Sequence, residues 1–91
     1  MAYQKPTVRE FQVHRVGALM TGPNNSSFLE CETSLGTIAF WGDSRSMVNI
    51  EAIRAASPPF RVRCGCITPR RTVSTHVLWV PQVVPVEITP A

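Results

Sequence analysis

The alternation of apolar and polar residues changes phase once along residues 8–20. Phe11 and Val13 share one parity, whereas the apolar residues on either side of Gly17 share the other. Alternation with a period of two is typical of a half-buried β-strand. A phase change beside a glycine indicates a bulge or a sharp coil, which lets one strand serve two sheets. The segment therefore predicts a long, coiled first strand.

The same alternation predicts the strands that follow, and a different spacing predicts one helix. Met47, Ile50 and Ile53 recur every three residues, as in the buried stripe of an amphipathic helix. Two prolines at 58 and 59 end that helix, because a residue before proline avoids the helical region. Its competent N-cap residues are Asp43, Ser44 and Ser46. The predicted elements are strands at residues 28–33, 37–41, 60–67 and 73–80, a helix at 46–56, and an edge segment at 83–88.

Length and composition indicate one small domain with an incompletely polar surface. The chain has 91 residues, which we assign to a single domain, 1–91, with ordered residues 7–88 and loose ends at 1–6 and 89–91. Charged residues make up 16%, below the usual quarter, which favours a homo-oligomer or a protein partner. No apolar run approaches the ~20 residues of a membrane span, and the N-terminus lacks the apolar core of a signal peptide. A cytoplasmic protein without membrane contact is expected.

The order of the predicted elements indicates a specific fold class. Three strands, a helix and two further strands, with a coiled first strand, form the chain order of an OB-fold, a five-stranded Greek-key barrel. We therefore expect a mostly β, OB-like barrel with one short helix. An SH3-like barrel and an open sheet packed against one helix use similar numbers of strands and are the alternatives.

Three short segments have the layout of a known family. They are Val16-Gly17-Ala18-Leu19 on the first strand, Phe40-Trp41-Gly42 before the helix, and Phe60-Arg61-Val62-Arg63-Cys64 after it. In these segments the chain resembles the bacterial single-stranded DNA-binding proteins, which implies an OB-fold that binds single strands. The glycine-rich tail and acidic C-terminal tip of that family are missing, so partner recruitment through such a tip is not implied. A shorter, primosomal-type or plasmid-type relative fits better.

Two aromatic residues are predicted on the outer face of the second and third strands. If the apolar residues of opposite parity fill the core, Phe28 and Trp41 lie outside it. Aromatic side chains on this face of an OB-fold stack on nucleobases. Trp79 is a third candidate for the same role. The alternative is that Trp41 covers one end of the barrel or packs in a dimer contact.

Arginine accounts for most of the positive charge and supplies the candidate phosphate ligands. Formal net charge is +3, and an arginine fork can bind a phosphate through two hydrogen bonds. Arg61 and Arg63, two residues apart on a strand, are expected on one face about 7 Å apart, and Arg70 and Arg71 add a basic loop. The alternative is an ordinary solvated strand face. Glu30 and Glu32 share the face of Phe28 and would repel phosphate unless they pair with arginines.

The cysteines and histidines are the residues that could form a metal or catalytic site. Cys31, Cys64 and Cys66 with His14 or His76 would supply the four ligands of a zinc site. Alternation instead places all three cysteines on core faces, which favours buried free thiols. Each histidine is expected on the surface of a strand, without a nucleophile to activate. The glycines are scattered and form no phosphate-binding loop. We therefore expect no metal, no cofactor and no enzymatic activity.

Two functions from different classes remain. The first is non-catalytic binding of single-stranded DNA or RNA, with stacking on Phe28 and Trp41 and with phosphates on the arginines. The second is a structural or adaptor module, or a homodimer, in which the valine-rich segment 80–88 adds a strand to a partner.

Overall fold

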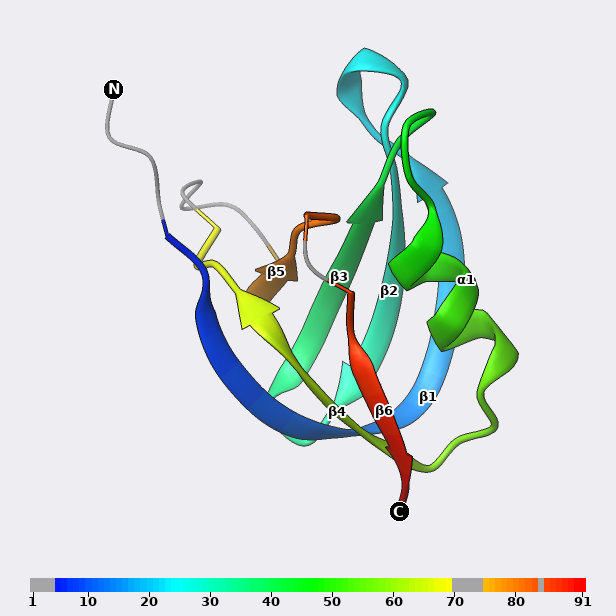
Figure 1. Cartoon of the computed structure of the whole chain (residues 1–91), viewed down its shortest axis with the longest axis vertical. Coiled ribbons are helices and arrows are strands. Elements are labelled where there is room, and N and C mark those ends of the chain that lie inside the picture. The colour runs from blue at the N-terminus through cyan, green and yellow to red at the C-terminus, as the bar shows by residue number, and fades with distance from the viewer. Residues whose placement is uncertain (1–4, 70–74, 84) are drawn as a thin grey trace.

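The computed structural model describes residues 5–69, 75–83 and 85–91. Its strands pair in one six-stranded sheet in the order β5-β3-β2-β1-β4-β6, accompanied by one α-helix and a 3-10 turn at Pro23–Asn25 (Figure 1). The predicted class, mostly β with one short helix, is confirmed. The elements are β1 (Thr7–Thr21), β2 (Ser27–Thr33), β3 (Gly36–Gly42), α1 (Val48–Ala55), β4 (Phe60–Cys66), β5 (Leu78–Val80) and β6 (Glu87–Pro90).

The first strand is long and pairs with a different neighbour along each half. Residues 7–13 of β1 pair antiparallel with β4, and residues 13–21 pair antiparallel with β2. The register with β2 shifts between Val16 and Leu19. A Cβ atom on Gly17 would lie 2.7 Å from the carbonyl oxygen of Glu30, so glycine allows the close approach of the two strands. The predicted bulge is confirmed, although β1 joins two neighbours in one sheet instead of two sheets.

The sheet is strongly curled (Figure 1) but open, with β5 and β6 at its two edges. A closed five-stranded barrel was the sequence-based expectation, and the open-sheet alternative agrees better with this order. The difference arises because β5 comprises three residues, Leu78–Val80, and because β6 occupies the other side of β4. A strand was predicted at 73–80, of which residues 73 and 74 lie outside the described part of the chain. Thr89 and Pro90 belong to β6, so the prediction of a loose end at 89–91 was wrong for them.

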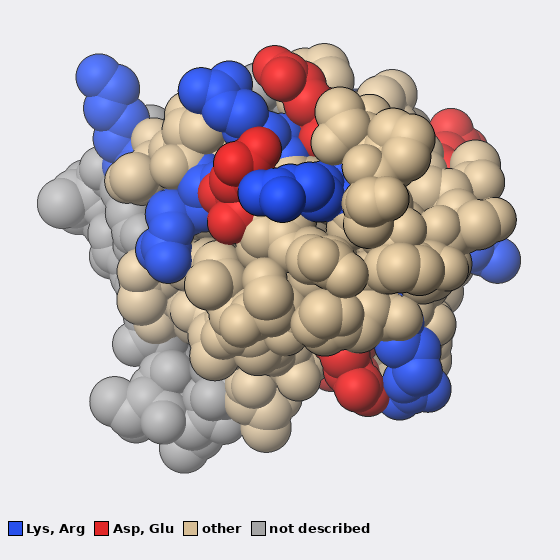
Figure 2. All heavy atoms as spheres, turned by 90° about the horizontal axis from the view of Figure 1, so that it is seen from below, with Lys and Arg blue, Asp and Glu red and all other residues tan. Residues whose placement is uncertain are grey.

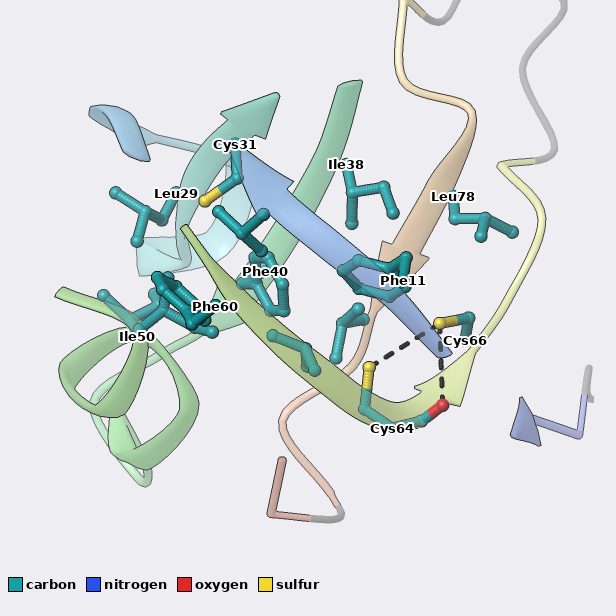
Figure 3. Packing of buried hydrophobic residues seen from close by; sticks show 14 residues of the cluster. Phe11, Leu29, Cys31, Ile38, Phe40, Ile50, Phe60, Cys64, Cys66 and Leu78 are labelled. Atoms are coloured by element: carbon teal, nitrogen blue, oxygen red, sulfur yellow. Dashed lines mark hydrogen bonds between the residues drawn. The ribbon is translucent and has the colours of Figure 1, made fainter. Parts of the chain in front are cut away.

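Core side chains come from the concave face of the sheet and from α1 (Figure 3). Leu29, Cys31, Ile38 and Phe40 are at most 1% exposed, as the alternation in β2 and β3 predicts. The inward parity of β4 is confirmed in the same way by Phe60, Val62, Cys64 and Cys66. Ile50 and Ile53 of α1 complete this core.

The helix begins later than the sequence predicts and without a side-chain cap. Met47 takes the N-cap position, and none of the three expected cap residues bonds the first turn. Asp43 instead accepts a hydrogen bond from the backbone amide of Arg45, 2.8 Å away, in the turn before the helix. The cap prediction failed because an aspartate also stabilises a tight turn through its own side chain.

Candidate functional site

Aromatic side chains gather on the outer face of β2, β3 and β5. Phe28 lies opposite Trp41 in the β2–β3 register, and their ring centroids are 4.7 Å apart. Trp41 meets Trp79 of β5 edge to face at 5.5 Å, and Phe28 meets His76 edge to face at 5.5 Å. We call Phe28, Trp41, His76 and Trp79 the aromatic cluster. The structure therefore brings together the three aromatic residues that the sequence singles out.

A chain of hydrogen bonds fixes one side of the aromatic cluster. Trp79 Nε1 donates to His76 Nδ1 over 3.2 Å, so the hydrogen of the neutral imidazole lies on Nε2. His76 Nε2 then donates to Glu30 Oε2 over 2.7 Å. The His76 side chain is only 10% exposed, and the residue precedes β5. The prediction of a surface strand histidine was therefore wrong for His76, which holds Trp79 in place.

The two tryptophans differ in their hydrogen bonding. Trp41 Nε1 is buried, and no described residue accepts a hydrogen bond from it, whereas Trp79 Nε1 donates to His76. Phenylalanine removes a similar apolar area at either position. Only Trp79→Phe also removes a hydrogen bond. We expect Trp79→Phe to lower the free energy of unfolding by about 1 kcal/mol more than Trp41→Phe does. Urea denaturation of the two variants checks this, and an equal loss would contradict the bonding shown here.

An apolar cavity of about 370 Å³ adjoins the aromatic cluster. Three segments form its walls: the turn between β1 and β2, the end of β3, and the segment that enters and leaves β5. Its lining residues are Pro23, Ser26, Trp41, Gly42, Asp43, Ile67, Trp79, Pro81, Gln82 and Val83. The cavity is therefore aromatic and aliphatic, with a few polar groups.

Asp43, which lines this cavity, forms an ion pair with Arg45. Nε and Nη2 of Arg45 donate to Asp43 Oδ2 over 3.3 Å and 3.0 Å. Hydrogen bonds from the Arg45 side chain, and then from its backbone amide, lower the pKa of Asp43 to about 2. The carboxylate is thus ionised at neutral pH. The Arg45 side chain is 83% exposed and stays open to solvent anions.

The predicted phosphate ligands on β4 are not on a strand that carries the aromatic cluster. Arg61 and Arg63 share the outer face of β4, as predicted, but β1 and β2 separate them from β3. Arg61 lies 3.6 Å from Glu10 and Arg63 lies 3.9 Å from Glu87. The underside of the molecule accordingly shows acidic and basic side chains next to each other (Figure 2). Arg70 and Arg71 lie outside the described residues.

The two glutamates that would oppose phosphate are both paired. Glu32 accepts hydrogen bonds from Arg15, with Nη2 at 2.6 Å, and Glu30 accepts from His76. The pairing of Glu32 with an arginine across the sheet agrees with the sequence-based alternative. Neither carboxylate therefore faces the aromatic cluster without a hydrogen-bond donor.

The cysteines belong to the core. All three are buried, and burial raises the pKa of the Cys31 thiol to about 11. Cys64 Sγ and Cys66 Sγ lie 3.7 Å apart, and this hydrogen bond together with burial raises the pKa of Cys64 (Figure 3). The prediction of buried thiols is confirmed. Within the described ranges, no three metal-ligating side chains lie close enough together to hold a metal ion.

Reasoning from sequence missed the roles of two residues in or beside the site, His76 and Arg45. His76 precedes Trp79 by three residues, but only the fold shows that it bonds both Trp79 and Glu30. Arg45 follows Asp43 by two residues, a spacing that could have indicated a turn with a paired guanidinium. The alternation of strand residues gives no sign of either group.

Comparisons with known proteins do not assign the chain to a family. No family model matches it, and searches of curated proteins and of solved structures also give no match. In the described part of the chain, no helix combines the length and hydrophobicity needed to cross a membrane. The candidate function therefore rests on the geometry of the aromatic cluster and of the cavity beside it.

Proposed function

We propose that this protein binds single-stranded nucleic acid on the outer face of β2, β3 and β5. The observation that carries the proposal is the aromatic cluster, which places two indoles and a phenyl ring on that face. Stacking of a base on an aromatic side chain contributes about 1–3 kcal/mol and is tolerant of sequence. We expect bases, and not phosphates, to supply most of the affinity.

We further propose that the fold is of the OB type, with its second and third strands carrying the ligand. Three features support this topology: a first strand shared between β2 and β4, a helix between β3 and β4, and a parallel pairing of β3 with β5. Ile67, just after β4, also forms an antiparallel bridge with Trp79 of β5 through hydrogen bonds of 2.8 Å and 2.9 Å. OB-folds bind oligonucleotides on strands 2 and 3 and on the flanking loops.

The distribution of charge sets the expected salt dependence. Arg15 pairs with Glu32 of β2 and Arg45 pairs with Asp43 just after β3, so we take these two arginines, on or beside the strands of the cluster, as its phosphate ligands. Each phosphate neutralised on a single strand contributes about −0.7 to the slope of log K against log salt. Two contacts therefore predict a shallow slope of about −1.4. This differs from the steep dependence expected when four arginines bind phosphate.

A fluorescence titration with a mixed-sequence single strand tests the proposal. Trp41 and Trp79 are the only tryptophans, so binding is expected to quench the emission of the cluster itself. Phe28→Ala is expected to weaken binding about 5- to 150-fold, as the loss of one stacked base predicts. The paired substitution Arg61→Gln with Arg63→Gln is the control and should leave the affinity within about twofold. Absence of quenching at low salt would overturn the proposal.

A second candidate, a homodimer or an adaptor module, is favoured by exposed apolar side chains. Leu19, Met20, Val77 and Val83 are all more than 40% exposed. A dimer that covers them should have twice the chain mass by light scattering, without dependence on salt or on oligonucleotide. A monomer at all concentrations would exclude the homodimer.

A further inference from the structure

We propose that the cavity beside Trp41 and Trp79 takes up one nucleobase of the bound strand, and that Arg45 binds the adjoining phosphate. This inference rests on the proposed function and specifies how the ligand is held. It differs from simple stacking on an open face, because one base would lie in a hollow formed by three segments of the chain.

The size and lining of the cavity fit a single base. Its volume of about 370 Å³ lies near the lower end of the ~300–1,000 Å³ of small-molecule sites. Trp41 and Trp79 line it together and meet edge to face, so at least one indole offers an apolar wall to a planar ring. Pro81 and Val83 add aliphatic contacts. A base is planar and largely apolar on its two faces, which matches such walls.

The lining of the cavity also contains polar groups that can hydrogen-bond the edge of a base. Ser26, Asp43 and Gln82 are its polar side chains. The Asp43 carboxylate is ionised, and a carboxylate accepts hydrogen bonds from the N–H groups of a base, such as N3–H of thymine or the N4 amino group of cytosine. Arg45 and the carbonyl oxygen of Pro23 already bond Asp43 and Ser26, which fixes the positions of these polar groups. A lining that combines apolar walls with fixed polar groups favours a planar nucleobase over a purely aliphatic ligand.

Arg45 supplies the charge complementary to a phosphate. Its Nε and Nη2 bond Asp43, whereas Nη1 bonds none of the described residues and the side chain is 83% exposed. The ion pair orients the guanidinium next to a residue of the cavity lining, and a guanidinium with free donors binds phosphate. The base and its phosphate would thus occupy adjacent positions.

A matched pair of variants at exposed valines tests the enclosure. Val83 lines the cavity and is 64% exposed, whereas Val48 is 54% exposed on α1 and outside the cavity. Val83→Phe fills the cavity, and Val48→Phe adds the same bulk elsewhere without removing core contacts. We expect Val83→Phe to weaken quenching by thymidine 5′-monophosphate and by a mixed oligonucleotide about tenfold. Val48→Phe should leave both unchanged.

The contribution of Arg45 is tested by comparing two probes. The protein should bind thymidine 5′-monophosphate roughly two- to fivefold more tightly than thymidine, as for an exposed charge pair. Arg45→Gln should remove that preference, while Arg54→Gln, on the exposed side of α1, should retain it. An unchanged preference in Arg45→Gln would overturn the assignment of the phosphate.

The outcomes separate this inference from the proposed function. If the oligonucleotide binds, and Phe28→Ala weakens it but Val83→Phe does not, then bases stack on the open face and the cavity inference is overturned alone. If thymidine 5′-monophosphate binds and Val83→Phe blocks it, but no oligonucleotide binds, then the nucleotide site is supported and strand binding is overturned. If neither probe quenches, both are overturned.

Discussion

Replacing Phe40 by alanine is expected to lower the free energy of unfolding by about 3–5 kcal/mol. The Phe40 ring is 0% exposed at the centre of the core, and its centroid lies 6.2 Å from that of Phe11. Removing it both loses the transfer free energy of the ring and leaves a cavity that the sheet cannot close. A small domain has about 5–15 kcal/mol of stability in total, so this single change removes a large part of it.

The control for Phe40→Ala is a valine of the helix surface. Val48 is 54% exposed, and Val48→Ala should change the free energy of unfolding by no more than about 0.5 kcal/mol. Urea denaturation followed by far-UV circular dichroism measures both. A loss below 1.5 kcal/mol for Phe40→Ala would contradict the placement of this ring in a packed core.

Strand faces could be predicted from sequence wherever one face of the strand is buried. In β2, β3 and β4, each apolar residue of the inward parity is buried, because adjacent side chains of a strand point to opposite sides. The turn between β2 and β3 likewise follows from one residue, because Gly36 has a positive φ of 124°, which glycine adopts without strain.

The open order of the sheet, with β5 and β6 at its edges, could not be predicted, because it depends on pairing between distant segments. The alternation at residues 73–80 resembles that of a full strand, yet among its described residues, 75–80, only Leu78–Val80 form strand β5 and pair with β3. The C-terminal residues were assigned to a loose end, although β4 offers them a free edge at which Arg61 pairs with Thr89. Local patterns show which face of a strand is apolar but not which neighbour it joins.

The candidate site was predictable only where strand alternation determines the face of a residue. Phe28 and Trp41 could be placed on one outer face because each has the outward parity of its own strand. Their partner His76 lies outside any strand and 46 residues from Glu30 in sequence, so no periodic pattern links them. The arginines of β4 were assigned from their charge and their shared strand face, and in the strand order β4 is separated from β2 and β3 by β1.

Asn49 connects the helix to the segment that borders the cavity. It is 1% exposed, its Nδ2 donates to the carbonyl oxygen of Pro81 over 3.3 Å, and its Oδ1 accepts from the amide of Val86 over 3.0 Å. A buried polar side chain with two backbone partners stabilises the conformation of the segment that holds them. Since Pro81 lines the cavity, Asn49 is expected to affect both stability and ligand binding.

Asn49→Ala is therefore expected to lower the free energy of unfolding by about 2–4 kcal/mol, because two backbone groups lose their partners. At a temperature where the variant is still folded, quenching by the oligonucleotide should also weaken, since one wall of the cavity is no longer held. Glu51→Ala, at an exposed position of the same helix, is the control and should alter neither property. A loss of stability without a loss of affinity would show that the wall keeps its shape without Asn49. Unchanged stability would instead contradict both hydrogen bonds.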